Sequence, residues 1–282
     1  MKTRTISGAC FVAIITGFFV LRQHVDARLF LVLLWLFCAI GTFETARAGK
    51  DKTTAFEFYS GVVLGVTVLP VYFLFETLFA SYGQVAANFY VAAFALAIIA
   101  EAFISKNSDG LGWAILPTIY PSVLLVLMAR LNYFAEPFGF IGLLLVFVIS
   151  PCADTMAYLV GMMYGKIKKG NVKKLCPRLS PNKTVAGAIG GLVGGTVGSL
   201  IVYAIFKPDL GLKLPVLFFA VTGLILAVAT EFGDLFESFI KRRAGIKDMG
   251  KIMPGHGGVM DRIDGISFAG AVALIIFTVI RL

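Results

Sequence analysis

The chain has 282 residues, of which 59% are hydrophobic and 15% charged, and its formal net charge is +9. This composition excludes an ordinary soluble domain and predicts an integral membrane protein. The basic residues are divided among short loops beside apolar segments, which argues against a nucleic-acid-binding protein.

Apolar segments of nearly membrane-spanning length recur along the whole chain, and such a helix needs roughly 20 apolar residues. They cover residues 5–21, 29–43, 58–79, 84–104, 111–131, 138–160, 184–206, 214–232 and 263–281. No small-residue cleavage pattern follows the first, so we expect it to be a retained helix. The sequence therefore predicts an all-α integral membrane protein with about nine transmembrane helices. We divide it into a scaffold of five helices, residues 1–135, and a catalytic domain of four, residues 136–282.

The lysines and arginines indicate an orientation. Most of the 25 fall in segments that lie in the cytosol if the N-terminus is cytosolic and the C-terminus is outside. Two strongly basic loops, residues 166–183 and 241–262, are then cytosolic, where nucleotides are found. We therefore expect a polar cavity that opens to the cytosol.

Acids inside apolar segments are the next signal. In the first half of the chain, Glu44 and Glu101 could each have a functional role or could simply be solvated at the membrane interface. Asp154 lies deep in the sixth segment, where an acid is costly enough to indicate function. Tyr158 and Gly161 follow on the same helix face, so that face offers a carboxylate, a phenol and a gap. A structural hydrogen bond from Asp154 is the alternative.

The basic loop 165–184 ends where we expect the next helix to start. Ser180 is placed to cap that helix, with Pro181 in its first turn and Lys183 and Thr184 beside the exposed amides. A helix N-terminus with a lysine is a phosphate site, so Ser180, Lys183 and Thr184 are predicted to contact nucleotide. The glycines from Gly187 to Gly198 predict close helix packing, with a phosphate cradle as the alternative.

The stretch 230–264 concentrates charge, with six of the 16 acidic residues and six of the 25 lysines and arginines. If its first part is one helix, Asp234, Glu237 or Ser238, and Lys241 share a face. Facing carboxylates repel and imply bound cations or paired bases. Carboxylate oxygens next to Lys and Arg suit Mg²⁺ that holds a polyphosphate.

Three motifs resemble those of the phosphatidate cytidylyltransferase, or CDP-diacylglycerol synthase, family. The longest runs through Gly233–Ser238, Lys241–Arg242, Lys247–Asp248, Pro254–Gly258 and Asp261–Asp264. The segment from Asp154 to Gly161 resembles the family's D-x-x-A-Y-x-x-G motif. The segment from Ser180 to Gly187 resembles S-P-x-K-T-x-E-G, although Ala186 replaces the usual Glu. Residues 1–150 match the family only by hydropathy and length.

The resemblance implies a Mg²⁺-dependent transfer of the cytidylyl group from CTP to phosphatidic acid, with release of pyrophosphate. It also implies a second cation, divalent or monovalent, and a homodimer. The compact chain is more similar to bacterial inner-membrane forms.

The site residues are assigned by chemical type. The predicted metal ligands are Asp234, Asp261, Asp264, Glu237 and Asp248. The predicted catalytic set is Asp234, Asp261, Lys241, Arg262 and His256, in which the two cations balance phosphate charge. The predicted substrate-binding set is Ser180, Lys183, Thr184, Asp154, Tyr158, Ser238, Arg242, Lys247, Gly257 and Gly258.

Two roles within these sets stay open. For His256 we favour ordering the loop or contacting phosphate over acting as a general base, because a phosphomonoester is already ionised near neutral pH. Ser238 is expected to make a hydrogen bond on its helix face.

Two functions from other classes also remain. One is a cation-coupled transporter, since buried acids and glycine-rich helices also describe ion pathways. The other is a lipid-alcohol kinase on the same scaffold.

Overall fold

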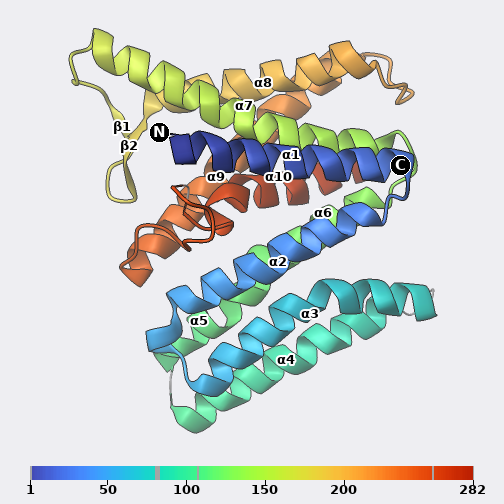
Figure 1. Cartoon of the computed structure of the whole chain (residues 1–282), viewed down its shortest axis with the longest axis vertical. Coiled ribbons are helices and arrows are strands. Elements are labelled where there is room, and N and C mark those ends of the chain that lie inside the picture. The colour runs from blue at the N-terminus through green and yellow to red at the C-terminus, as the bar shows by residue number, and fades with distance from the viewer. Residues whose placement is uncertain (1, 80–82, 107, 256, 282) are drawn as a thin grey trace. The chain divides into compact units, whose positions relative to one another are not determined.

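The computed structural model describes residues 2–79, 83–106, 108–255 and 257–281, and most of them are helical (Figure 1). The helices are α1 (Lys2–His24), α2 (Leu29–Ala48), η1 (Lys50–Lys52), α3 (Ala55–Phe79), α4 (Gly83–Ser105), α5 (Ser108–Pro117), η3 (Thr118–Val123), α6 (Leu124–Asn132), α7 (Phe138–Ile167), α8 (Val185–Phe206), α9 (Pro215–Ala244) and α10 (Met260–Val279). The strands are β1 (Lys174–Cys176) and β2 (Ser180–Thr184).

Eight helical segments within the described residues are long and apolar enough to cross a membrane. Helices α1, α2, α3, α7, α8, α9 and α10 each supply one. The eighth runs from Gly110 to Asn132 through α5, η3 and α6. The remaining expected segment, 84–104, coincides with α4, in which Leu96–Ser105 forms a shorter apolar stretch. The predicted all-α membrane architecture is confirmed.

The chain forms two compact units. Unit 1 comprises Met1–Ala129 and Ala244–Ile263, and unit 2 comprises Arg130–Arg243 and Asp264–Leu282. The loop after α9 thus packs in the same unit as the N-terminal helices. Compactness does not assign function, so the division into a scaffold and a catalytic domain at residue 135 stays a prediction.

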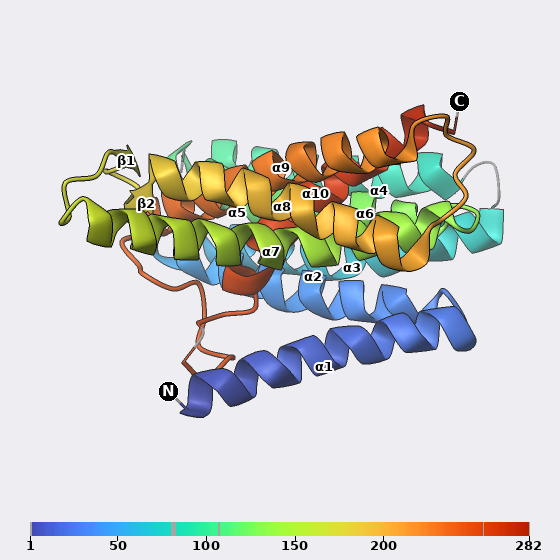
Figure 2. The ribbon, with the colours of Figure 1, turned by 90° about the horizontal axis from the view of Figure 1, so that it is seen from above.

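The core of unit 1 is a close contact between α2, α3 and η3. Gly65 of α3 leaves room for the hydroxyls of Thr42 and Ser122, whose oxygens lie 2.8 Å apart. The Cys38 thiol donates to the Gly65 carbonyl at 3.1 Å. Because a glycine is present at this crossing, the backbone of α3 can approach α2 closely. Helix α1 lies beside α2 (Figure 2). Two pairs of aromatic rings, Phe11 with Phe37 and Phe19 with Phe30, join the two helices.

The core of unit 2 is built on the glycines of α8. Helices α7 and α8 run side by side (Figures 1 and 2). A Cβ at Gly190 would lie 2.6 Å from Val160 of α7, and one at Gly195 would lie 2.6 Å from Ala227 of α9. The glycines therefore let α8 pack against both neighbours. This confirms the predicted close packing, and the phosphate cradle stays an alternative prediction.

Helices α9 and α10 also approach closely within unit 2. A Cβ at Gly233 would lie 2.6 Å from the carbonyl oxygen of Asp264, and one at Gly265 would lie 2.6 Å from Cγ2 of Thr230. Each of these glycines neighbours a predicted metal ligand, since Gly233 precedes Asp234 and Gly265 follows Asp264. The same packing that joins the two helices thus positions two of the site's carboxylates.

Candidate active site

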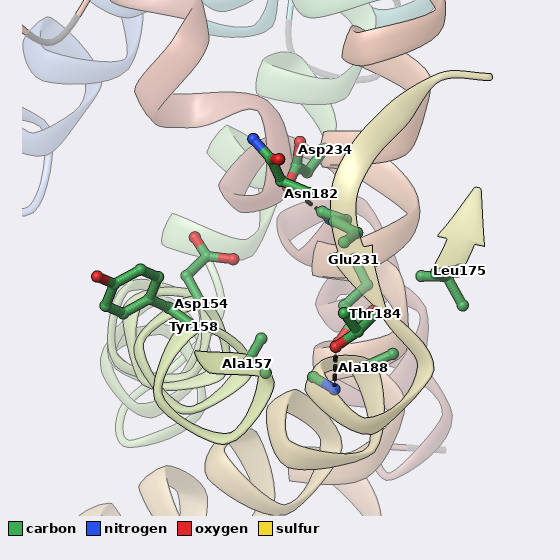
Figure 3. A pocket seen from close by; sticks show the side chains of 12 residues that line it. Asp154, Ala157, Tyr158, Leu175, Asn182, Thr184, Ala188, Glu231 and Asp234 are labelled. Carbon is green, nitrogen blue, oxygen red and sulfur yellow. Dashed lines mark hydrogen bonds and ion pairs between the residues drawn. The ribbon is translucent and has the colours of Figure 1, made fainter. Parts of the chain in front are cut away.

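One cavity of about 250 Å³ in unit 2 gathers polar side chains from three elements, α7, β2 and α9. It is lined by Asp154, Ala157, Tyr158, Gly161, Leu175, Asn182, Lys183, Thr184, Gly187, Ala188, Glu231 and Asp234. Figure 3 shows Asp154 and Tyr158 of α7 on one side, opposite residues of β2 and α9. The predicted residues Asp154, Tyr158, Lys183, Thr184 and Asp234 therefore share one cavity.

A short ion pair joins two of the predicted motifs across this cavity. The Lys183 ammonium of β2 lies 2.5 Å from the Asp234 carboxylate of α9, and both side chains are partly exposed. Lys183 is held there by the antiparallel pairing of β1 with β2, in which Lys174 is opposite Thr184 and Cys176 is opposite Ser180. The motif lysine is thus fixed beside the motif carboxylate.

The start of α8 corrects one prediction. Ser180 does not cap the helix and Pro181 does not lie in its first turn, because Ser180–Thr184 is a β-strand. Helix α8 begins at Val185, and its N-cap is Thr184, whose side-chain oxygen accepts a hydrogen bond from the Gly187 amide at 3.0 Å. Both Ser and Thr are good N-caps, so the sequence offered two starting points.

Helix α9 bears out the predicted polar face. It is one continuous helix, in which the Lys241 ammonium pairs with the buried Glu237 carboxylate one turn away. The Ser238 hydroxyl lies 3.5 Å from the Asp234 carboxylate, a long contact on the same face, as expected for its hydrogen bond. Arg242 donates through Nε to the Leu179 carbonyl at 3.2 Å, so it joins α9 to the turn between the two strands.

Asp264 completes the acidic group of unit 2. It begins the part of α10 that packs on α9, and it interacts electrostatically with Glu237, Asp234 and Asp154. Its Oδ1 accepts a hydrogen bond from the Gly265 amide at 2.8 Å. The negative charges of the predicted carboxylates on α9 and α10 therefore lie close enough to repel one another.

Sequence reasoning missed Glu231, which lines the same cavity. Its Oε1 is buried and makes no hydrogen bond. That oxygen occupies the space above Gly191 of α8, where a Cβ would overlap it. Glu231 precedes Asp234 by three residues, so the helical period that was applied from Asp234 onward also places Glu231 on this face.

Four more predicted residues, Lys247, Asp248, Gly257 and Arg262, lie in unit 1 and line a second cavity of about 480 Å³. It is lined by Lys247, Asp248, Gly250, Lys251, Met253, Pro254, Gly255, Gly257 and Arg262. Three of the lining side chains, Lys247, Lys251 and Arg262, are cationic, so the cavity can attract an anionic phosphate. His256 lies outside the described residues.

Asp261 organises the loop that forms this cavity. Its Oδ2 accepts hydrogen bonds from the amides of Met249 at 3.0 Å and Gly258 at 2.7 Å. Gly257, with a φ of +85°, adopts a backbone conformation that side chains disfavour, and a Cβ there would lie 2.6 Å from the same carboxylate. The predicted ligand Asp261 is therefore also a loop-ordering residue.

The predicted site residues thus fall into two groups, one in each unit. Within the described residues, no three Asp, Glu, His or Cys side chains converge in a geometry ready for a metal ion. The donor chemistry nevertheless fits Mg²⁺, which keeps several waters and needs only one or two carboxylates from a protein. Glu231 and Asp234 line one cavity and are carboxylates that can supply such oxygens.

Comparison with known proteins identifies the class. Residues 2–280 match the model of the cytidylyltransferase family. The chain therefore belongs to the cytidylyltransferase family, a family of nucleotidyl-transferring enzymes, and is an integral membrane member of it.

The similar curated proteins carry a narrower name. A Bacillus subtilis protein is 31% identical over 278 residues, 95% of this chain and 94% of the relative. A Helicobacter pylori protein is 30% identical over 278 residues, 97% and 90% of the two chains. A Brucella abortus protein is 36% identical over 178 residues, so the chain matches only 62% of that relative's length. Each is named phosphatidate cytidylyltransferase.

Proposed function

We propose that this chain is a phosphatidate cytidylyltransferase, which converts CTP and phosphatidic acid to CDP-diacylglycerol and pyrophosphate. The observation that carries the proposal is the pairing of Lys183 with Asp234 at the cavity of unit 2. A cation for a polyphosphate and a carboxylate for a metal ion lie side by side, in motifs that resemble this family. The names of the relatives that match nearly the whole chain support the same activity.

The reaction is a direct displacement at the α-phosphorus of CTP. An oxygen of the lipid phosphate forms a bond to that phosphorus, the bond to the β-phosphate oxygen breaks, and pyrophosphate leaves with the electron pair. Both reactants are anions, so the protein must neutralise and align them. Because the lipid phosphate is already ionised, no residue has to remove a proton from it.

The residues of the chain are assigned to these tasks by their surroundings. Lys183 holds the phosphates of CTP, and Thr184 fixes the start of α8 beside them. Lys241 keeps the buried Glu237 paired while α9 presents Asp234 to the cavity. In unit 1, Lys247 and Arg262 balance phosphate charge at their own cavity. Gly257 in the wall of that cavity, and Gly258 next to it, let the backbone approach.

Magnesium is part of the proposal. The proposed ligands in unit 2 are Asp234, Asp264 and Glu231. Those in unit 1 are Asp261 and Asp248. These carboxylates would hold Mg²⁺, which would supply positive charge against the negative charge of the phosphates. A second cation and a homodimer, both implied by the family resemblance, complete the proposal.

The proposed location is a bacterial inner membrane. The N-terminus and both basic loops lie in the cytosol and the C-terminus lies outside, as the distribution of lysine and arginine favours. Phosphatidic acid then enters from the bilayer while CTP arrives from the cytosol.

Radiolabel position in CTP tests the reaction directly. Purified protein is incubated with phosphatidic acid or diacylglycerol, and with CTP labelled at either the α- or the γ-phosphate. We expect α-label to enter lipid with phosphatidic acid alone. Entry of γ-label with diacylglycerol would instead show a lipid kinase. If neither label enters lipid with either acceptor, the result would contradict both enzymes and favour a transporter.

A further inference from the structure

Glu44 of α2 is a buried carboxylate that the reaction scheme does not use. Its side chain is only 2% exposed, and it lies within a segment long and apolar enough to cross a membrane. An acid in such a place is costly unless hydrogen bonds satisfy it. Its partners therefore indicate why it is there.

Those partners belong to the signature loop, defined here as residues 247–255 and 257–262. Glu44 Oε2 accepts a hydrogen bond from the Met260 amide at 2.8 Å, and Oε1 accepts one from the Val259 amide at 3.3 Å. These amides open α10, where backbone donors have no partner within the helix. The carboxylate thus joins α2 to the start of α10, across more than 200 residues of sequence.

The loop is shaped around this carboxylate. A Cβ at either Gly250 or Gly258 would overlap the oxygens of Glu44. Gly258 also donates its amide to Asp261, so Glu44 and Asp261 hold the same turn from two sides. If Glu44 only filled space between helices, the loop would not need a glycine at both positions that face its carboxylate.

We infer that Glu44 is a positioning residue that holds the signature loop in the conformation required for nucleotidyl transfer. Through Val259 and Met260 it fixes the two residues that precede Asp261, and through Gly250 it fixes part of the wall of the cavity. The inference rests on the proposed function for its catalytic part, but the loop conformation itself is measurable without substrate.

The test compares Glu44→Gln with wild type in two assays on purified full-length protein. Trypsin cleavage after the exposed Lys251 reports the loop, and initial rates with CTP and phosphatidic acid report turnover. Gln keeps the shape but replaces one acceptor by a donor that faces backbone donors. We expect cleavage to become about tenfold faster and kcat to fall about tenfold or more, the size expected for losing one charged hydrogen bond.

Glu57→Gln is the matched control, because Glu57 is also a fully buried carboxylate of a membrane helix in unit 1. It forms a capping box at the start of its own helix, where the Thr54 amide donates to Glu57 Oε2 at 2.7 Å. We expect the control to lower the melting temperature without accelerating cleavage after Lys251. Equal cleavage and equal kcat per folded molecule in the two variants would overturn the inference.

A second variant approaches the same contact from the loop. Gly250→Ala leaves α2 unchanged but places a methyl group against Glu44. It should reproduce both effects of Glu44→Gln, and wild-type cleavage and turnover in this variant would also overturn the inference. If wild-type protein transfers no label from CTP to lipid, the proposed function fails, whereas the cleavage comparison still decides the role of Glu44 in the loop.

Discussion

The close crossing of α9 and α10 gives the sharpest test of how the fold positions the carboxylates of unit 2. In Gly233→Ala, the new Cβ would lie 2.6 Å from the Asp264 carbonyl oxygen and 3.0 Å from the Gly265 Cα, whereas ordinary contacts begin at 3.4 Å. The nearest of these atoms is a backbone oxygen, which cannot rotate away, so the two helices must move apart by about 0.8 Å. Asp234 and Asp264 move with them.

A displacement of about 1 Å at reacting groups costs roughly 100-fold in rate. We therefore expect Gly233→Ala to fold but to lower kcat for nucleotidyl transfer by about two orders of magnitude. The assay is the initial rate with saturating CTP and phosphatidic acid, normalised to protein that is monodisperse in detergent. Gly17→Ala is the control, because a Cβ at Gly17 of α1 meets nothing within 4 Å and should leave the rate unchanged. A Gly233→Ala enzyme with wild-type kcat would refute the argument that this crossing sets the geometry of the site.

Three further substitutions test individual assignments. Lys183→Ala removes the cation paired with Asp234, so we expect KM for CTP to rise by about tenfold while KM for the lipid stays constant; an effect on the lipid alone would reverse the assignment. Asp261→Asn should abolish turnover in protein that remains folded in detergent, and normal activity would remove Asp261 from the site. Thr184→Ala deletes the N-cap of α8 and should lower the free energy of unfolding by about 1 kcal/mol, so unchanged denaturant stability would argue against the cap.

Helical structure and local faces could be predicted from the sequence because they depend on short-range periodicity. The apolar segments were long enough to identify the spanning helices, and the spacing within α9 placed Asp234 and Lys241 on one face. The glycines of α8 predicted close packing because a small residue recurs every three or four positions.

The parts that could not be predicted depend on distant partners. The strand Ser180–Thr184 forms because it pairs with Lys174–Cys176, whereas its Ser-Pro start looks locally like a helix cap. The role of Glu44 depends on amides at the opposite end of the chain, so its own segment left it open. Glu231 is different, because it precedes Asp234 by three residues and the helical period of α9 alone places it on the same face.

Release of pyrophosphate is the measurement that tests the central claim most directly. Purified protein in mixed micelles with phosphatidic acid is given CTP or ATP, each with Mg²⁺ or with EDTA. We predict release with CTP and Mg²⁺ only, because the carboxylates of α9 and α10 are proposed to act through the metal ion and the site is proposed to select cytidine. No release from folded protein under any of these conditions would contradict the account.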